Sequence, residues 1–407
     1  MEPEGDVTNP ASLDPESLGF MCGIEVHQQL ATGKLHSRQV GEMHDITIET
    51  LPETWPRYAR RLRTSSGEGG KVDVAARFEA KRNRSFIYCQ SPNSGLIELD
   101  EQPPLPHDLD ALDISLTVSG MINAHPVPLL QTMRKTVVDG SNTSGFQRTT
   151  LVATDGVLQT EGGPVGIDVL CLEEDSARKL DSKLTPDGEI VTWNLDRLGI
   201  PLIEIATAPD VKSPDHAKQT SIALGRTLRD TRKVRRGLGS IRQDLNVSIM
   251  CGDRVEIKGC QDLEWIPKII RCEMARQLHF YRLANTLRTN HNLPLLSSDR
   301  RKESVSIEQV VKQILPHEII DVSEAFTSCK SKRVEQGMEE GFVMMALPLP
   351  GFSGYIGTKE FDVDGAQLPR LGRELAGAAK LAGVAGVYHS DELPAYGIDQ
   401  ELSLIHI

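Results

Sequence analysis

A mixed α/β fold is what the sequence predicts, on three observations. Residues 21–30, MCGIEVHQQL, alternate apolar and polar side chains, a pattern typical of a half-buried strand. Residues 133–161 are spaced by glycine and rich in threonine and valine, which favours short strands joined by turns. Residues 267–287 carry apolar side chains at helical spacing. Strands and helices therefore alternate along the chain.

Three further segments predict helices. An apolar run over residues 109–124 follows the break ELDEQPPLPHDLD. A second helix should begin at Ser213, where Ser-Pro-Asp supplies an N-cap, a proline at the first helical position and an acid for the helix dipole. We expect that helix to end near Gly237. The alanine-rich residues 370–382 predict the last helix.

Breaks in these patterns divide the chain into four parts. Residues 1–18 are acidic and contain proline, so we expect a flexible leader before a principal domain over residues 19–292. The polar, turn-prone HNLPLLSSDRRKESVS marks the next boundary, and a second module is expected over residues 293–401. The last six residues, 402–407, do not continue the preceding pattern. Our hypothesis is that they are not native.

Composition excludes several classes of protein. With 407 residues, of which 39% are hydrophobic and 25% charged, the chain can form globular cores over two or three domains. It has no run of about 18 apolar residues, and its acidic start is unlike a signal peptide, so we expect a cytoplasmic protein. The seven cysteines form no C-x-x-C pair, which favours reduced, mostly buried thiols.

The net charge of −12 argues against indiscriminate binding of nucleic acid, so any RNA contact must be local. Three basic clusters could provide such a contact, and solvated faces are the alternative for each. The clusters are Arg57, Arg60, Arg61 and Arg63; Lys81, Arg82 and Arg84; and Arg226, Arg229, Arg232, Lys233, Arg235 and Arg236.

Acidic residues stand in four otherwise apolar or strand-like segments. An acid within an apolar strand is costly to bury unless a cation or a hydrogen-bond donor compensates its charge. Hard cations such as Mg²⁺ prefer carboxylate oxygens, so these segments could together form a metal site. Isolated surface or hydrogen-bonded acids are the alternative. The four segments contain Glu25 and His27; Glu173, Glu174 and Asp175; Glu204; and Asp244 with Asn246.

Long collinear strings resemble the GatB/GatE family of tRNA-dependent amidotransferases, and within it the archaeal GatE branch. They include GIEVHQQL, MRKTVVDGSNTSGFQRT, CLEEDSARK, NLDRLGIPLIEIATAPD, RKVRRGLGSIRQDLNVSI and VEIKG, and they span roughly residues 18–290. The later strings ALPLPGFSGYIG and LPRLGRELAGAAKLAGVAGVYHSDELPAYGI resemble the aspartyl-tRNA-synthetase-like (GAD) insertion domain of that branch. The resemblance implies a cradle domain, built from a mixed sheet with helices, followed by this α+β domain, which would be incomplete.

The resemblance also implies a reaction. ATP phosphorylates the γ-carboxylate of glutamate on Glu-tRNA(Gln), and ammonia then displaces the phosphate to give Gln-tRNA(Gln). Mg²⁺ would be required with ATP. The chain has no recognisable amidase motif, so a partner must release the ammonia; in the resembled system it is GatD, an asparaginase-like protein, in a heterodimer or heterotetramer. No membrane or DNA partner is expected.

Carried onto this sequence, the family pattern assigns residues to three roles. The metal and catalytic set is Glu25, His27, Glu174, Glu204 and Asp244, with Glu173 as the alternative to Glu174 and a supporting or core role as the alternative for His27. Arg134, Lys135, Arg242 and Lys258 would hold phosphate or acyl phosphate, with surface salt bridges as the alternative. Ser141, Asn142 and Gln147 would hold a ligand or pass ammonia, with an ordinary turn as the alternative. The basic residues from Arg226 to Arg236 would contact tRNA.

One departure from the family pattern concerns the segment after the first strand. Relatives commonly read K-L-F-C there, whereas this chain reads KLHSRQ, so His36 and Ser37 replace the thiol motif and we infer no cysteine-based site. Two rival interpretations are open at this point. The chain could be a catalytically silent tRNA-binding or assembly scaffold, or a bacterial-type GatB.

Overall fold

The structure is a computed structural model that describes residues 2–61, 84–185, 188–300, 319–381 and 384–389. It has the predicted mixed α/β composition. The chain divides into two compact units. One comprises Met21–Asn246 and Val255–Pro267, and the other comprises Met1–Phe20, Val247–Arg254 and Lys268–Ile407. The predicted division between residues 292 and 293 falls inside the second of these units, and the hypothesis about residues 402–407 lies outside the described residues.

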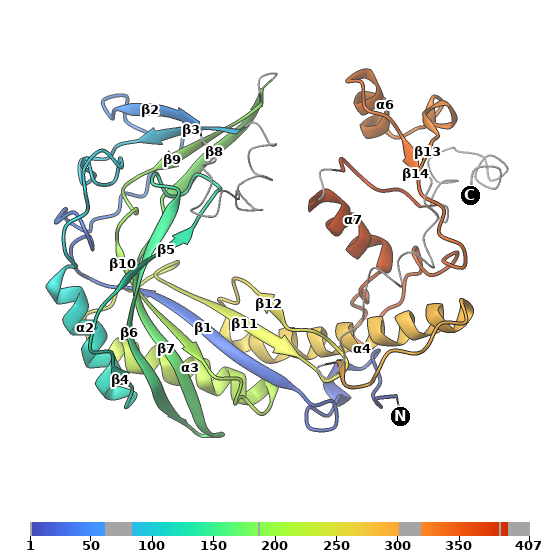
Figure 1. The fold of residues 1–407 in the computed structure, drawn as a ribbon, viewed down its shortest axis with the longest axis horizontal. Helices are drawn as coiled ribbons and strands as arrows, with labels where there is room; N and C mark the ends of the chain where they lie inside the picture. The colour runs from blue at the N-terminus through green and yellow to red at the C-terminus, as the bar shows by residue number, and fades with distance from the viewer. Residues whose placement is uncertain (1, 62–83, 186–187, 301–318, 382–383, 390–407) are drawn as a thin grey trace. The chain divides into compact units, whose positions relative to one another are not determined.

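The first unit is built on an eight-stranded sheet (Figure 1). Its strand order is β12-β11-β1-β10-β7-β6-β4, with β5 also pairing with β6. The strands are β1 (Met21–Gln29), β4 (His125–Pro126), β5 (Thr132–Thr136), β6 (Phe146–Thr160), β7 (Gly163–Glu174), β10 (Pro201–Thr207), β11 (Ile241–Ser248) and β12 (Val255–Ile257). The sequence predicted β1 from its alternation, and the structure confirms it: Ile24 and Val26 are buried, while Glu25 and His27 point to the opposite face.

Two helices pack against this sheet and against each other, α2 (Leu109–Met121) and α3 (Pro214–Asp230) (Figure 1). Ser213 caps α3 as predicted, since its hydroxyl accepts a hydrogen bond from the amide of His216. The helix ends at Asp230, earlier than the predicted end near Gly237. The reason is that the following residues pair with the end of β1, where Val234 forms a bridge with Leu30.

A second, four-stranded sheet belongs to the same unit. Its order is β2-β3-β9-β8, formed by β2 (Arg57–Arg61), β3 (Arg84–Cys89), β9 (Gly188–Asn194) and β8 (Arg178–Thr185). Strands β3 and β9 are parallel and the other pairs are antiparallel. Phe86 and Tyr88 of β3 and Val191 and Trp193 of β9 form a buried apolar cluster on one face. The Tyr88 hydroxyl donates a hydrogen bond to the carbonyl of Gly140, which joins the cluster to the loop before β6.

The second unit contains most of α4 (Ile266–Asn290), together with α6 (Lys332–Glu339), α7 (Leu371–Leu381), β13 (Ile320–Asp321) and β14 (Met345–Ala346). Short 3-10 turns occur at η1 (Pro10–Ser12) and η4 (Ser323–Phe326), while η2 (Leu263–Trp265) precedes α4 in the first unit. Both predicted helices are confirmed, α4 and α7. The apolar spacing that predicted α4 becomes its packed face, because Ile270, Met274, Leu278 and Tyr281 are buried.

The N-terminal segment packs into this second unit. Leu13 and Leu18 are buried, and the amide of Met250 donates a hydrogen bond to the carbonyl of Leu18. Two leucines of this acid-rich segment are therefore buried in the folded protein. The flexible leader over residues 1–18 stays a prediction from the charged and proline residues that surround these leucines.

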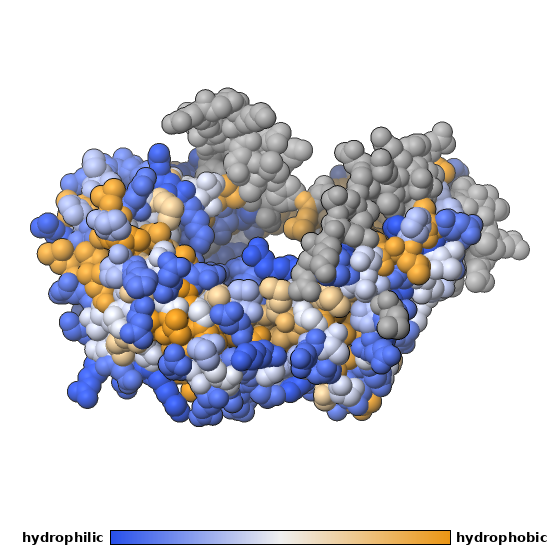
Figure 2. Space-filling view, turned by 60° about the horizontal axis from the view of Figure 1, so that its bottom comes forward, coloured by the Kyte–Doolittle hydropathy of each residue, from blue (hydrophilic) through white to orange (hydrophobic). Residues whose placement is uncertain are grey.

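All seven cysteines lie among the described residues and are free, and five of them are buried, as the sequence predicts. Within the described part of the chain, every helix is too short or too polar to cross a membrane. Figure 2 shows hydrophilic residues over much of one face, with apolar side chains in patches between them.

Candidate active site

Three adjacent strands bring four predicted site residues together. In the pairing of β1 with β10, His27 lies opposite Glu204. In the pairing of β10 with β7, Glu173 lies opposite Leu202, which is two residues from Glu204 on the same strand and so on the same face. His27 Nε2 is 3.4 Å from Glu25 Oε1, 3.4 Å from Glu173 Oε1 and 3.9 Å from Glu204 Oε2. One potential ligand atom each of Glu25, His27 and Glu204 lies within 4.8 Å of the others. We call Glu25, His27, Glu173 and Glu204 the acid cluster.

A second acidic group adjoins the acid cluster through Glu25. Carboxylate oxygens of Glu25, Asp244 and Glu256 lie within 4.8 Å of one another. Lys258 Nζ is 3.1 Å from Asp244 Oδ2 and 2.6 Å from Glu256 Oε1, so an ammonium group already balances part of this charge. Sequence reasoning missed Glu256. The signal that could have identified it is its position two residues before Lys258, because alternate residues of an extended chain share one face.

The structure places Glu173, and not Glu174, in the acid cluster. Both residues end β7, and successive side chains of a strand point to opposite faces. Glu173 is buried beside His27 and accepts a hydrogen bond from the Thr149 hydroxyl. Glu174 is buried on the other face, where Arg148 Nη1 lies 2.9 Å from its Oε1. Of the two alternatives that the sequence left open, Glu173 is therefore the one that lies beside His27.

Electrostatics at the acid cluster favour a cation. Burial, followed by the neighbouring charge of Glu204, raises the pKa of Glu173 to about 8. The same two causes raise the pKa of Glu25, and burial lowers the pKa of His27. Glu204 Oε2 is shielded from solvent and accepts no hydrogen bond from the described residues, although Lys135 Nζ lies 3.8 Å away. Like charges held this close lose free energy unless a cation offsets them.

The donor set fits a hard divalent cation. Three carboxylates and one imidazole offer mainly oxygen ligands, which Mg²⁺ prefers, and the imidazole is the less typical member. Oxygens of Asp244 and Glu256, close to Glu25, offer further carboxylate ligands to a cation beside the acid cluster. The arrangement can therefore hold a cation and place two lysines, Lys135 and Lys258, beside it.

The four cations predicted to bind phosphate do not all lie at the acid cluster. Lys135 contacts Glu204, and Lys258 contacts Asp244. Arg242 Nη2 is held 2.9 Å from Asp175 Oδ1. Arg134 precedes Lys135 on β5 and consequently points to the opposite face of the sheet, where its guanidinium lies 5.6 Å from the ring centre of Phe146. Arg134 is thus separated from the acid cluster by the sheet.

The opposite face of the sheet carries a pocket of about 580 Å³. Residues 100–106 line it together with the polar and aromatic side chains of His36, His107, Arg134, Phe146 and Arg148. A narrow second cavity shares His36 and Arg148 with this pocket and reaches Glu174. A basic and aromatic site therefore lies across the sheet from the acid cluster, and Arg148 and Glu174 belong to the pocket's side of the sheet.

Three predicted loop residues support this region through their own hydrogen bonds. The Ser141 hydroxyl donates to Asp139, and Asn142 Oδ1 accepts from the Ser176 hydroxyl. Gln147 Nε2 donates to the backbone carbonyl of Glu174. Ser141 and Asn142 lie in the loop before β6, whereas Gln147 lies in β6 itself, and the contacts of Asn142 and Gln147 join this region to the end of β7 and to Ser176.

The burial of His36 makes the free energy of unfolding depend on pH. Its Nδ1 lies 2.9 Å from the carbonyl of Leu105, and burial lowers its pKa from 6.5 to about 4. The unfolded chain keeps the ordinary value, so it binds more protons than the folded protein between pH 6.5 and 4. This neutral histidine should therefore cost the folded state about 2 kcal/mol at pH 5 relative to pH 7.

The variant His36→Asn tests this expectation, because asparagine keeps a donor for Leu105 but does not titrate. The free energy of unfolding, measured in urea, is compared at pH 7 and pH 5 for the variant and the parent. The decrease on going to pH 5 should be about 2 kcal/mol smaller for His36→Asn than for the parent. His125→Asn, at an exposed histidine, is the control. Parallel pH profiles for His36→Asn and the parent would show that His36 is not buried as described.

The basic residues from Arg226 to Arg236 differ in their exposure to solvent. Arg226, Arg229, Arg232, Lys233 and Arg236 are at least partly exposed, as an RNA contact requires. Arg235 is different: its guanidinium donates hydrogen bonds to the carbonyls of Leu30 and Gly41, and burial lowers its pKa. Arg235 therefore fixes the chain after β1 instead of facing solvent.

The other two basic clusters contain both exposed residues and residues held in ion pairs. Arg57 and Arg61 on β2 are exposed, while Arg60 Nη2 lies 2.6 Å from Glu101. Arg84 lies 3.5 Å from Glu189 on the neighbouring strand β9. Arg63, Lys81 and Arg82 lie outside the described residues.

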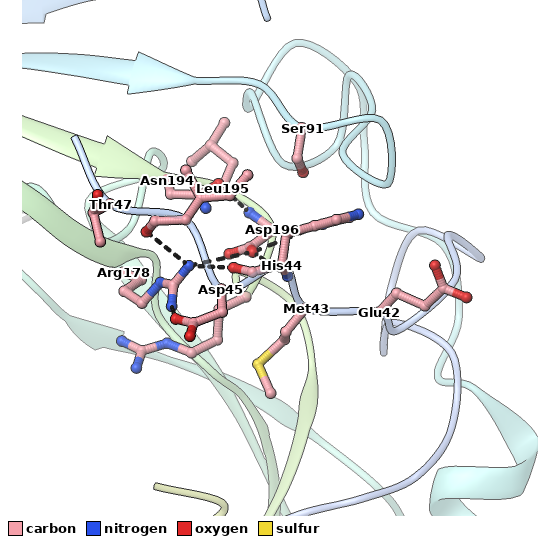
Figure 3. Close-up of polar contacts among 12 residues, drawn as sticks. Glu42, Met43, His44, Asp45, Thr47, Ser91, Arg178, Asn194, Leu195 and Asp196 are labelled. Atoms are coloured by element: carbon pink, nitrogen blue, oxygen red, sulfur yellow. Dashed lines mark hydrogen bonds and ion pairs between the residues drawn. The ribbon is translucent and has the colours of Figure 1, made fainter. Parts of the chain in front are cut away.

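Hydrogen bonds and ion pairs around the buried carboxylate of Asp196 hold the segment that follows β1 (Figure 3). The guanidinium of Arg178 donates a hydrogen bond to the carbonyl of His44 and forms ion pairs with Asp45 at 3.5 Å and Asp196 at 3.8 Å. The amide of His44 donates to Asp196 Oδ2 at 2.9 Å. Arg178 and Asp196 lie in strings that carried the family resemblance, and here they serve the packing of a long connection over the small sheet.

Known proteins support the family resemblance. The family model for the GatB/GatE catalytic domain matches residues 20–313. The E subunit of glutamyl-tRNA(Gln) amidotransferase from Methanocaldococcus jannaschii is 43% identical over 392 residues, which cover 96% of this chain and 57% of that protein. The corresponding protein of Pyrococcus furiosus is 42% identical over 390 residues, which cover 96% of this chain and 56% of that protein. That of Methanosarcina acetivorans is 43% identical over 389 residues, which cover 95% of this chain and 56% of that protein.

This chain accordingly spans a little over half the length of the curated relatives that it matches. The matched region of the family model contains every residue of the acid cluster and of the basic pocket on the opposite face of the sheet. The chain belongs to the GatB/GatE catalytic-domain family.

Proposed function

We propose that the protein catalyses the conversion of Glu-tRNA(Gln) to Gln-tRNA(Gln), with ATP and Mg²⁺ as cofactors, as an archaeal-type GatE. The observation that carries the proposal is the convergence of acids from β1, β7 and β10 on one face of the sheet, with Lys135 and Lys258 beside them. The names of the relatives, glutamyl-tRNA(Gln) amidotransferase, support the choice of substrate. A tRNA substrate would place the reaction in the cytoplasm.

The chemistry of the substrate explains why such a site is needed. A carboxylate is a poor electrophile at neutral pH, and its conversion to an acyl phosphate supplies a leaving group that ammonia can displace. In this proposal Glu25, His27, Glu173 and Glu204 hold Mg²⁺, which would offset negative charge on the phosphates of ATP. Lys135 and Lys258 would contact phosphate oxygens, because both ammonium groups lie beside the acids that would hold the metal.

The proposal requires a source of ammonia. A partner with an asparaginase-like activity, GatD, would supply it, in a heterodimer or heterotetramer as the family resemblance implies. We assign the pocket bordered by Arg134, Phe146 and His107 to the entry side for ammonia, because the narrow cavity beyond it leads from His36 to Glu174. Ser141, Asn142 and Gln147 would then act by holding the wall of this route.

We also propose that residues 293–401 form the aspartyl-tRNA-synthetase-like insertion domain. Val322, Phe326 and Val334 make a small buried cluster of their own within this segment, which is what a separate module needs. The strings that resemble that domain supply the identification.

A direct assay tests the proposed function. Full-length protein is mixed with ATP, Mg²⁺, ammonium chloride and either Glu-tRNA(Gln) or uncharged tRNA(Gln), so that added ammonium replaces the partner. We expect ATP cleavage and Gln-tRNA(Gln) formation only with the charged tRNA. Binding of tRNA without ATP cleavage would instead identify the protein as a scaffold.

The exposed basic stretch should contribute to tRNA affinity. Replacing Arg232 and Arg236 with alanine removes two cations that are free to face phosphates, so binding should weaken and the slope of log affinity against log salt should fall by up to about 2. The exposed pair Lys179 and Lys183 on β8 is the charge-matched control. An unchanged salt slope for the double variant would show that this stretch only solvates the end of α3.

A further inference from the structure

The four residues 236–239 form a projecting tip on a rigidly held base. The amide of Arg235 donates to the carbonyl of Gln29, and the amide of Gln29 donates to the carbonyl of Ser240, both at 2.9 Å. The buried side chain of Gln28 adds donations from its Nε2 to the carbonyls of Arg235 and Ser240. The two ends of the tip are therefore fixed to β1, the strand that carries Glu25 and His27.

An apolar side chain stands at the end of this tip. Leu238 is fully exposed, at 104% of its reference area. It lies between Gly237 and Gly239, whose φ angles of 107° and 80° belong to the left-handed region that glycine adopts without strain. A Cβ added at either glycine would meet none of the described atoms within 4 Å, so the tip stands clear of them. A partner that covered Leu238 would gain the free energy of burying its side chain, without the cost of ordering the base of the tip.

The surroundings of Leu238 identify the chemistry of that partner. Arg232, Lys233 and Arg236 are exposed in the same loop, on a chain whose net charge is −12, so the loop is complementary to a polyanion. Leu238 lies six residues before Asp244, so at most about 22 Å of extended chain separates it from the second acidic group. Arg242, between them, is held in place by Asp175. A single-stranded RNA end reaching the acid cluster could contact this loop.

We propose that Leu238 is a positioning residue for the single-stranded acceptor end of the tRNA. Its side chain would pack against the sugar or base of a terminal nucleotide, while Arg232, Lys233 and Arg236 contact phosphates. Such a contact is independent of base sequence, and it would orient the ester-linked amino acid toward the acid cluster. This inference rests on the proposed function and adds a residue that the family pattern did not assign.

The test compares two forms of one tRNA. Full-length protein and its Leu238→Ala variant are titrated with intact tRNA(Gln) and with the same tRNA lacking its single-stranded 3′ nucleotides. Loss of the buried part of one leucine should weaken binding of intact tRNA about tenfold and leave binding of the truncated tRNA unchanged. Leu184→Ala, at an exposed leucine on β8, is the control and should bind both forms like the parent.

Kinetics and a conservative variant separate positioning from a structural role. Leu238→Ala should raise the KM for Glu-tRNA(Gln) with little change in kcat or melting temperature, and Leu238→Met should restore the parent KM. Equal weakening for intact and truncated tRNA, or parent-like binding by Leu238→Ala, would overturn the assignment of Leu238 alone. A parent protein that binds no tRNA would overturn the proposed function as well, so the two failures are distinguishable.

Discussion

Replacing Glu204 with glutamine is expected to reduce Glu-tRNA-dependent ATP cleavage at least about 100-fold. The amide has nearly the volume of the carboxylate but lacks the charge that would hold a cation between β1, β7 and β10. Glu204 Oε2 is shielded from solvent and lies 3.9 Å from His27 Nε2 and 3.8 Å from Lys135 Nζ. The carboxylate therefore faces the other groups of the site and not bulk water. Without that charge, phosphoryl transfer loses part of its electrostatic stabilisation.

Stability measurements separate this effect from misfolding. Glu204 raises the pKa of both Glu25 and Glu173, so the carboxylates repel one another when no cation is bound. Removing one of them should leave the melting temperature of the metal-free protein unchanged or higher, while the stabilisation by added Mg²⁺ should shrink. Glu53→Gln, at an exposed glutamate, is the control. ATP cleavage by Glu204→Gln at the parent rate would make Glu204 a structural acid and refute the metal assignment.

Local patterns in the sequence predicted the elements that position the site. Alternation placed Glu25 and His27 on one face of a strand, and the Ser213 cap placed the start of α3, because both signals are complete within a few residues. The end of α3 was not predictable in this way. It depends on the bridge between Val234 and Leu30, residues about 200 positions apart in the chain, and a local glycine signal near residue 237 does not report such a pairing.

Strand facing explains the remaining differences at the site. Glu173 and Glu174 are neighbours at the end of β7, and Arg134 and Lys135 are neighbours in β5, so either member of each pair could have faced the acids. Which member does so is decided by the register of β7 against β10 and of β5 against β6. Register is a long-range property. The sequence therefore identified the segments of the site, and only the assembled sheet identified the side chains.

Replacing Arg148 with methionine is expected to destabilise the protein by about 3–5 kcal/mol, the largest stability effect that we predict. Arg148 Nη1 lies 2.9 Å from Glu174 Oε1, and the Glu174 side chain is almost wholly buried. Burial raises the pKa of Glu174, and the charge of Arg148 opposes that shift. Methionine keeps apolar volume beside Phe146 but leaves a buried carboxylate without its partner.

The sign of the pH dependence follows from this pairing. Without Arg148 the folded-state pKa of Glu174 rises further above its unfolded value near 4.5, so the folded protein binds a proton that the unfolded chain releases. Stability is then retained at low pH and lost as the pH rises through the raised folded-state pKa. Urea unfolding of Arg148→Met should accordingly show a larger deficit against the parent at pH 8 than at pH 5.

The double variant Arg148→Met with Glu174→Gln decides whether the deficit comes from the unpaired charge. A neutral amide at position 174 removes the buried carboxylate, so the double variant should recover most of the lost stability, short of the cation-π contact that Arg148 makes with Phe146 at 5.3 Å. A double variant no more stable than Arg148→Met would locate the loss in packing instead.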